Sequence, residues 1–183
     1  MKTSMAYFPD LSTYAYVPSS AQAITTQNVG WLALGHDFTI ATPSESLLER
    51  LWEFCAVSVW PTRGMHFCPF CEEERPYRGE RGGVQLALGS AEIRVFGRTG
   101  QLAFASPNLI YHYVASHNYS PPPAFLEAVE AGPRPVSPEY REMLARAELP
   151  WTVTPLEAKE PAVFRFVKRD GKVEREWIVK PKR

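Results

Sequence analysis

The sequence predicts an α+β protein organised around a metal knuckle, and three observations support this. Apolar segments of strand length alternate with glycine-containing turns, which is typical of antiparallel strands. Several segments have apolar residues at helical spacing and begin with a capping residue and a proline. Paired cysteines precede paired histidines, a ligand set that zinc prefers. We therefore expect a zinc-knuckle, treble-clef-like module with a small antiparallel β-meander, several short helices and a C-terminal β-hairpin.

The length and composition fit one globular unit with an appendage. The chain has 183 residues, of which 45% are hydrophobic and 22% charged, which is ordinary for a protein with a hydrophobic core. We expect residues 1–132 to form the zinc-knuckle α+β domain. Residues 133–183 are predicted to be a linker, a short helix and the hairpin, packed on the same domain.

The charge balance and the apolar pattern restrict the class of protein. Twenty basic residues balance twenty acidic ones, so the chain lacks the overall positive field of a dedicated nucleic-acid or membrane-surface binder. Apolar runs are too short for a signal peptide or a membrane span. The sequence thus predicts a cytoplasmic protein that does not associate with membranes.

The first elements are a strand and an amphipathic helix. Residues 28–34 provide the best strand candidate in the N-terminal part. Thr42 as N-cap, Pro43 at the first helical position and Glu45 in a capping box predict a helix over residues 43–56. Cys55 lies on the apolar stripe of this helix, so we expect it to be a buried small side chain rather than a ligand.

A loop and a sheet are expected in the middle of the chain. Residues 72–83 are polar and rich in glycine, which predicts a solvated loop. Segments 84–88, 91–96 and 101–105 have strand composition and are separated by glycine turns, starting with Gly89-Ser90. These three strands are predicted to form the antiparallel meander.

Helices and a hairpin are expected beyond the meander. Ser106-Pro107 predicts the start of the helix that carries both histidines, and a further helix over 124–131 ends at Gly132. Ser137-Pro138 predicts a short polar helix through about Ala147. The hairpin comprises segments 163–169 and 172–179, which flank the favoured turn Asp170-Gly171.

The candidate metal ligands are Cys68, Cys71, His112 and His117. The sequence Cys68-Pro-Phe-Cys71 lets two sulfurs reach one ion, and forty residues separate it from the first histidine. Two histidines five residues apart are offset by about 140° on an ideal helix. Their rings can converge if the helix tightens or ends near His117. The order of knuckle, strands and histidine-bearing helix is the logic of zinc-finger modules.

Other interpretations of these residues stay open. His66 lies two residues before the first cysteine and could replace a helical histidine, or hydrogen-bond to a ligand. The cysteines could instead be packed thiols beside ordinary helix histidines. A thioredoxin-like redox motif is disfavoured, because the motif precedes a loop rather than opening a helix. Catalytic zinc usually has three protein ligands and an open position, so four ligands favour a structural ion.

The segment from Arg63 to Val129 resembles a known family. The resemblance rests on His66-x-Cys68-x-x-Cys71 and on His112-Tyr113-Val114-x-x-His117-x-Tyr119-x-Pro121-Pro122-x-x-Phe125. It is similar to an uncharacterised group of small bacterial proteins common in actinobacteria, and covers roughly residues 6–130. The resemblance implies a metal-knuckle domain and no established reaction.

The sequence favours a binding protein over an enzyme. We expect a structural-zinc protein-interaction module, for instance a bacterial immunity or accessory protein with a protein partner. The alternatives are a zinc-dependent nucleic-acid-binding protein and a zinc hydrolase. Nucleic-acid binding would use the basic segment that begins at Arg165 and ends at Arg183, which interleaves aromatic residues. A hairpin with one solvated face explains this segment equally well, and we favour that explanation.

Overall fold

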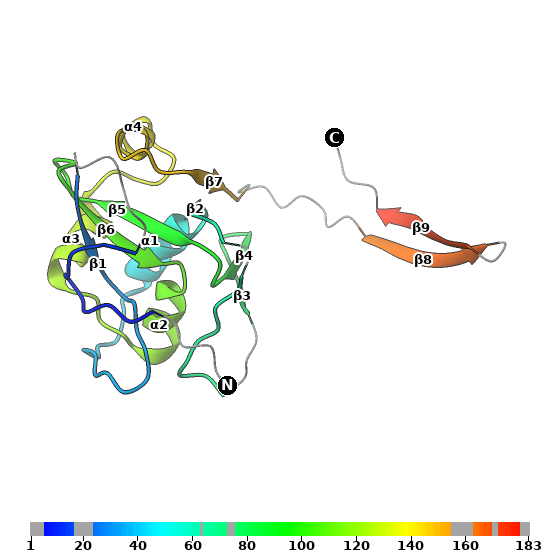
Figure 1. Ribbon diagram of the computed structural model, residues 1–183, viewed down its shortest axis with the longest axis horizontal. Coiled ribbons are helices and arrows are strands. Elements are labelled where there is room, and N and C mark those ends of the chain that lie inside the picture. The colour runs from blue at the N-terminus through cyan, green and yellow to red at the C-terminus, as the bar shows by residue number, and fades with distance from the viewer. Residues whose placement is uncertain are drawn as a thin grey trace.

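A five-stranded sheet forms the centre of the protein (Figure 1). This computed structural model describes residues 6–16, 24–62, 64–72, 76–154, 163–169 and 172–179. The strand order is β1-β6-β5-β2-β7, and β1 runs parallel to β6 while the other neighbours are antiparallel. The strands are β1 Thr25–Asn28, β2 Val57–Val59, β5 Glu92–Phe96, β6 Leu102–Pro107 and β7 Trp151–Val153. The fold class is therefore α+β, as predicted.

Two further sheets have two strands each. Strand β3 (Tyr77–Arg81) pairs with β4 (Val84–Leu88), and β8 (Val163–Arg169) pairs with β9 (Lys172–Val179). The second pair is the predicted C-terminal hairpin, with the predicted strand boundaries. Its predicted turn residues and the side chains of both strands lie outside what the structure describes. The packing of this hairpin on the domain stays a prediction.

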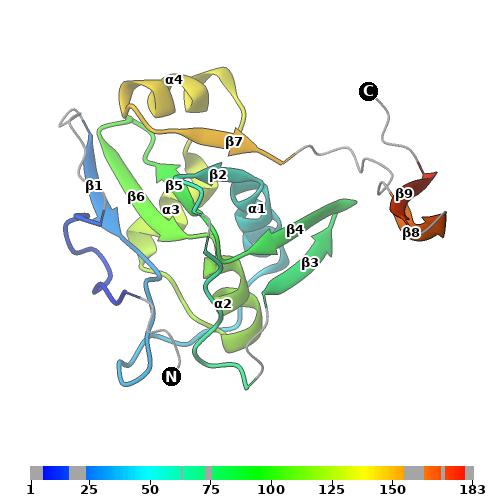
Figure 2. The same cartoon turned by 45° about the vertical axis from the view of Figure 1, so that its right-hand side comes forward.

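Four helices accompany the sheets in the described part of the chain. They are α1 Glu45–Cys55, α2 Ile110–His117, α3 Pro123–Ala131 and α4 Pro138–Arg146. Helices α1 and α3 contact each other and both contact β5, so they cover one face of the sheet (Figure 2). Helix α4 is anchored by Tyr140, whose hydroxyl donates to the Arg94 carbonyl oxygen at 2.7 Å. In the described part of the chain, no helix is both long and apolar enough to cross a membrane.

Every residue of β5 is buried, which shows that both faces of the sheet are covered at its centre. Ile93 and Val95 lie on one face, while Glu92, Arg94 and Phe96 alternate onto the other. Phe96 packs edge-on against Tyr140 with ring centroids 5.5 Å apart. Because both faces of this strand are covered, its sequence does not alternate strictly between apolar and polar residues. An inner face could therefore not be identified from the sequence.

The predicted three-stranded meander is wrong in its first strand. Strands β5 and β6 pair as expected, but β4 pairs with β3 in a separate sheet. The edge of β5 that β4 would need pairs instead with β2, through Val59 and Glu92. The missed partner β3 lies in the predicted solvated loop. Its turn, Gly82-Gly83, has positive φ at both residues, as a two-residue hairpin turn requires.

Three predicted boundaries also differ from the structure. The first strand ends at Asn28 rather than beginning there, because Gly30 adopts φ +73° and breaks the extended backbone. The first helix is capped by Ser44, whose Oγ accepts from the Leu47 N–H at 3.2 Å, so Thr42 is not the cap. Pro107 is the last residue of β6 and not a helix start.

Candidate metal centre

The four predicted ligands come from two elements. Cys68 and Cys71 lie on the loop between β2 and β3, whereas His112 and His117 lie on α2. One ligand atom from each of the four residues lies within 4.8 Å of all the others. The structure therefore brings these four residues together as a group that can hold a metal ion. His66 is not a member of this group.

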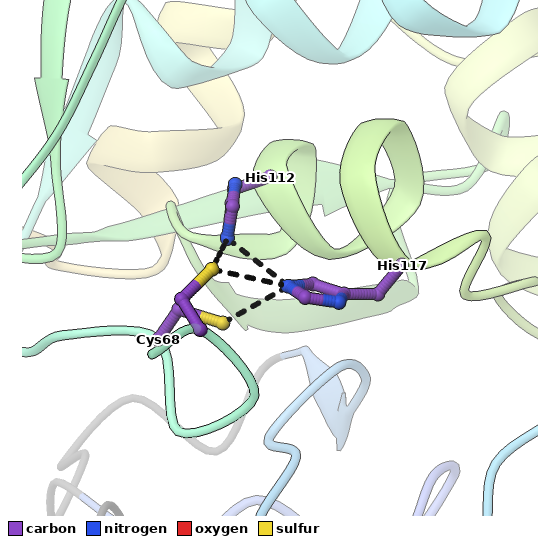
Figure 3. Close-up of side chains that lie close together, drawn as sticks. Cys68, His112 and His117 are labelled. Atoms are coloured by element: carbon purple, nitrogen blue, oxygen red, sulfur yellow. Dashed lines mark hydrogen bonds between the residues drawn. The ribbon is translucent and has the colours of Figure 1, made fainter. Parts of the chain in front are cut away.

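The ligand atoms point to a common centre (Figure 3). The two histidine Nε2 atoms are 3.2 Å apart, and the Nε2 of His117 is 3.2 Å from the Cys68 sulfur and 3.5 Å from the Cys71 sulfur. The Cys71 sulfur is 3.3 Å from the Nε2 of His112. Ligands of a tetrahedral zinc ion are expected at about 3.3 Å for two nitrogens and about 3.6 Å for a nitrogen and a sulfur. The observed N–N separation matches its edge, and the N–S separations of 3.2, 3.3 and 3.5 Å are up to about 0.4 Å shorter than theirs.

Hydrogen bonding alone does not account for this arrangement. The Nε2 of His117 has three neighbours within 3.5 Å, yet a neutral ring nitrogen offers only one hydrogen or one lone pair. Two Nε2 atoms at 3.2 Å can share at most one proton. Four lone pairs directed at one point are the arrangement in which a cation replaces the protons.

Electrostatics keeps both histidines in the form that binds metal. Burial, together with the neighbouring His117, lowers the pKa of His112 to about 4. Burial also lowers the pKa of His117. Both rings are therefore neutral at neutral pH, with a lone pair available. Burial raises the pKa of the Cys68 thiol to about 11, so a bound cation would have to displace that proton.

The Nδ1 atom of His112 is buried and has no hydrogen-bond partner among the described residues. An unsatisfied buried ring nitrogen costs about 1–3 kcal/mol. A metal on Nε2 would leave the proton on Nδ1, where ligating histidines ordinarily donate to an acceptor, so this unpartnered atom does not itself support the ligand assignment. The ring packs against Tyr77 at a tilt of 41°, with centroids 4.7 Å apart.

The fold explains how two histidines five residues apart converge. Helix α2 ends at His117, and Asn118 follows in the left-handed conformation with φ 54°. The last turn therefore closes at the second ligand, as the sequence suggested. Phe70, which lies between the cysteines, packs 5.4 Å from the His117 ring and 5.9 Å from the Tyr113 ring. The knuckle is thereby packed directly onto the helix.

Hydrogen bonds position the residues that lead up to Cys68, which we call the cysteine arm. The N–H of His66 donates to the Gly89 carbonyl at 2.7 Å, and the N–H of Thr62 donates to Ser90 at the same distance. The N–H of Gly89 donates to Oδ1 of buried Asn108, at 2.7 Å. Asn108 lies two residues before the histidine helix, so it joins the cysteine arm to that helix. Sequence reasoning missed Asn108, because the predicted helix began at Ser106-Pro107 and contained it.

A cavity of about 640 Å³ borders the ligand group. Cys68, Cys71 and His112 line it together with Glu72 and Arg78, among others. Three of the four ligands are thus reachable from this side. Sequence reasoning placed Glu72 in a solvated charge run and did not anticipate the cavity, since the β3 strand that walls it was not predicted.

Two other sequence features have defined positions. Cys55 is buried, and its thiol donates to the Asn108 carbonyl at 3.3 Å, so it is a packed side chain outside the metal group. The basic segment 165–183 lies partly in β8 and β9, whose side chains the structure does not describe. Its nucleic-acid interpretation stays a prediction.

The comparisons with known proteins identify a family and no activity. No curated protein and no solved structure matches the chain. A family model described as a domain of unknown function, DUF7919, matches residues 6–130. This range contains all four residues of the metal group and excludes helix α4 and the C-terminal hairpin. The chain belongs to the DUF7919 family.

Proposed function

We propose that the protein binds one zinc ion through Cys68, Cys71, His112 and His117, in a treble-clef-like knuckle. The observation that carries this proposal is the convergence of the four ligand atoms within 4.8 Å. Two thiolates and two neutral imidazoles are a donor set that zinc takes in tetrahedral sites. Softer thiolate ligands also disfavour magnesium and calcium, which prefer oxygen ligands.

We propose that this ion is structural. Four protein ligands complete a tetrahedral shell, whereas catalytic zinc keeps one position for water or substrate. The ion would join the loop between β2 and β3 to helix α2, which are more than thirty residues apart in the sequence. It would thus stabilise a part of the fold that has little regular secondary structure of its own.

The biological role that best suits such a centre is protein binding. We propose a protein-interaction module, such as a bacterial immunity or accessory protein acting on a protein partner. An apolar cavity of about 610 Å³ between α1, β4 and β7 supports a binding role, with Trp52, Val84 and Val153 in its lining. Two basic residues of its lining are paired within the chain, because Arg81 bonds Glu45 and Arg134 bonds Glu53.

One observation favours a catalytic zinc as a second candidate. Three of the ligands line the 640 Å³ cavity together with Glu72, whose carboxylate could serve as a general base. This function requires that one of the four residues leaves the coordination sphere to admit water. The structural and catalytic proposals therefore predict different behaviour of single ligand variants.

Metal analysis of the purified chain, followed by ligand substitution, tests these proposals. We expect about one zinc per chain, and a Cys68→Ser variant that loses zinc and unfolds at lower temperature. A chain purified without metal that does not take up zinc on addition would refute the proposal. A Cys68→Ser variant that keeps its zinc and its stability would refute the structural role and favour the catalytic one.

A further inference from the structure

A third cavity is lined by aromatic residues and one buried acidic residue. Its volume is about 140 Å³, close to the roughly 150 Å³ of a protein cavity that holds one benzene molecule. Tyr16, Trp31, Trp60 and Glu92 contribute to its lining. We call it the aromatic pocket. It shares none of the four metal ligands and takes its walls from several separate segments of the chain.

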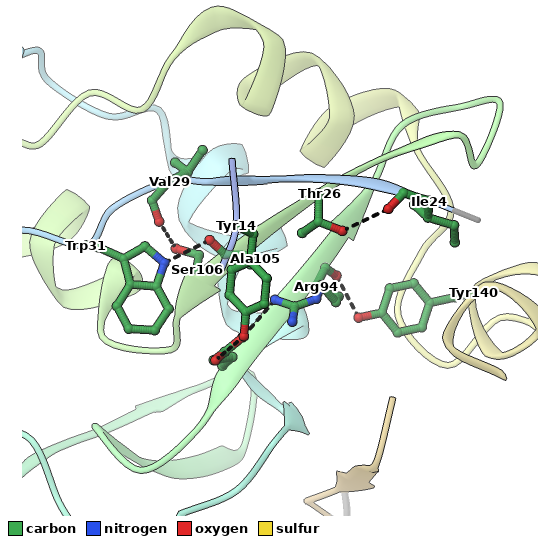
Figure 4. Close-up of polar contacts among 10 residues, drawn as sticks. Tyr14, Ile24, Thr26, Val29, Trp31, Arg94, Ala105, Ser106 and Tyr140 are labelled. Atoms are coloured by element: carbon green, nitrogen blue, oxygen red, sulfur yellow. Dashed lines mark hydrogen bonds and ion pairs between the residues drawn. The ribbon is translucent and has the colours of Figure 1, made fainter. Parts of the chain in front are cut away.

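The aromatic walls are held in place by the fold. Trp31 is buried, and its Nε1–H donates to the Ala105 carbonyl at 3.1 Å (Figure 4). Tyr16 lies 5.0 Å from Trp31 between ring centroids and is 42% exposed, so it stands at the entrance. Phe8 supports Trp31 edge-on at 5.5 Å. The rings are thus preorganised without any ligand.

Trp60 adopts a backbone conformation that disfavours large side chains. Its φ is +47°, in the left-handed region that bulky residues rarely occupy. Such strain costs about 1–3 kcal/mol and is concentrated at binding and catalytic sites. The N–H of Trp60 donates to the Pro150 carbonyl at 3.1 Å, which holds the strained residue at the end of β2. The strain places a third aromatic side chain in the lining of the pocket.

Tyr14 and Arg94 hold the carboxylate of Glu92 in place. Glu92 is buried and accepts from the Tyr14 hydroxyl at 2.9 and 3.0 Å and from the Arg94 Nη1 at 2.8 Å. The Arg94 guanidinium lies 4.6 Å from the centroid of the Tyr14 ring (Figure 4). Glu92 is the acidic residue of the pocket lining, whereas Tyr14 and Arg94, which hold its carboxylate, are not among the lining residues.

We propose that the aromatic pocket binds an alkylated ammonium group. Aromatic faces attract organic cations through their quadrupoles, and quaternary ammonium groups are bound in aromatic cages of this kind. A trimethylammonium group fits the volume, and Glu92 supplies the opposite charge. Arg94 partly cancels this charge, so the aromatic rings provide most of the selectivity. The pocket goes beyond the proposed zinc function and does not depend on it.

Binding of choline and of its neutral carbon isostere, in which carbon replaces the quaternary nitrogen, tests the proposal directly. Both are titrated into the full zinc-loaded chain by calorimetry, with the indole N–H signals followed by NMR. We expect choline to bind about tenfold more tightly than the isostere. Equal affinity of the two compounds, or no binding of either compound and of the peptide below, would overturn the proposal.

A third ligand distinguishes whether the ammonium group belongs to a protein side chain or to a small metabolite. A short peptide with one trimethyllysine is compared with the same peptide carrying unmodified lysine. Tighter binding of the trimethylated peptide than of choline assigns the pocket to a protein side chain. Tighter binding of choline assigns it to a small metabolite. Both results support an alkylammonium site.

Two variants locate the binding. Trp60→Leu should weaken choline binding at least about fivefold and weaken the isostere less, since both lose apolar contact but only choline loses the cation–π attraction. Glu92→Gln should act in the same direction. Trp151→Leu is the matched control, because Trp151 is a half-buried tryptophan outside the pocket lining. Unchanged choline binding in Trp60→Leu, with folding verified by NMR, would overturn the assignment even if Glu92→Gln fails to fold.

Discussion

Two buried polar clusters among the described residues differ in how their polar groups find partners. In the cluster of Tyr14, Glu92 and Arg94, each hydrogen-bonding group meets a complementary one, and the carboxylate accepts three hydrogen bonds. In the group of Cys68, Cys71, His112 and His117, like atoms face each other at hydrogen-bond distance. The first cluster is complete within the chain, whereas the second becomes complete when a cation joins it. The first cluster can therefore serve as a control in experiments on the metal group.

The largest difference is expected on removal of the knuckle sulfurs. A Cys68→Ser/Cys71→Ser variant should lose its zinc and at least about 5 kcal/mol of unfolding free energy, because structural zinc contributes roughly 10–16 kcal/mol in small modules. Metal analysis and urea unfolding measure the two effects. Excess chelator should destabilise the wild type and leave this variant unchanged.

A histidine control keeps this result specific. His36→Ala removes an exposed imidazole that stacks on Tyr7 with centroids 3.5 Å apart, outside the metal group. We expect His36→Ala to retain one zinc per chain and its stability within about 0.5 kcal/mol. Equal losses in His36→Ala and His112→Ala would show that the effect does not come from the metal.

The cluster of Tyr14, Glu92 and Arg94 should respond to the loss of a charge and not to the loss of metal. Arg94→Met leaves the Glu92 carboxylate buried without its cation and should cost about 3–5 kcal/mol. The double variant Arg94→Met/Glu92→Leu removes both charges and should recover most of this loss. Zinc content should be unchanged in both, and chelator should destabilise them as much as the wild type. Loss of zinc in either variant would show that the two clusters are not independent of each other, which would contradict the comparison.

A smaller effect is expected where the cysteine arm touches the core. A Cβ at Gly89 would lie 2.2 Å from the His66 carbonyl oxygen, and Gly89 has φ +113°. Gly89→Ala should therefore cost about 2–3 kcal/mol and weaken zinc binding, because the arm that carries Cys68 must move. Calorimetric zinc titration measures the second effect.

Gly64 provides the matched control on the same arm. A Cβ at Gly64 meets nothing within 4 Å, so Gly64→Ala should change neither zinc affinity nor stability by more than about 0.5 kcal/mol. If both glycine variants bind zinc like the wild type, the arm does not position the knuckle.

These clusters also show what the sequence could predict. The metal group was predictable because Cys68-Pro-Phe-Cys71 and two histidines on one helix form a local pattern with chemical meaning. The Glu92–Arg94 pair carried no such pattern, since a charged residue in a strand ordinarily faces solvent. Burial of this pair depends on Tyr14, seventy-eight residues from Glu92, which no local rule can foresee.

The sheets were predicted to a similar degree. Strand composition identified β4, β5, β6 and both strands of the C-terminal hairpin, and capping residues identified α4. Pairing was missed where it is decided by tertiary contacts: β2 occupies the edge of β5, and β1 joins β6 in parallel. The three residues of β2 begin two residues after the helix ends at Cys55, and this short segment was assigned to no element from the sequence.

The smallest predicted effect tests how much the Glu92 carboxylate depends on its hydrogen bonds from Tyr14. Tyr14→Phe removes the hydroxyl that donates to both carboxylate oxygens and should cost about 1.5 kcal/mol at neutral pH. Burial raises the pKa of Glu92, and the bonds from Arg94 and Tyr14 oppose this rise. The variant should therefore raise the Glu92 pKa further, which an NMR titration of the carboxyl carbon measures.

The pH dependence gives this prediction its sign. A raised carboxyl pKa in the folded state means that ionisation of Glu92 opposes folding as the pH rises through that pKa. The Tyr14 hydroxyl stabilises only the ionised form, so the cost of Tyr14→Phe should shrink as the pH falls through the Glu92 pKa. Comparing wild type and variant at each pH cancels the titration of the metal group, which both contain. A cost that is constant across this range would mean that Tyr14 acts by packing on Arg94, and the hydrogen bonds to Glu92 would then not be what completes the cluster.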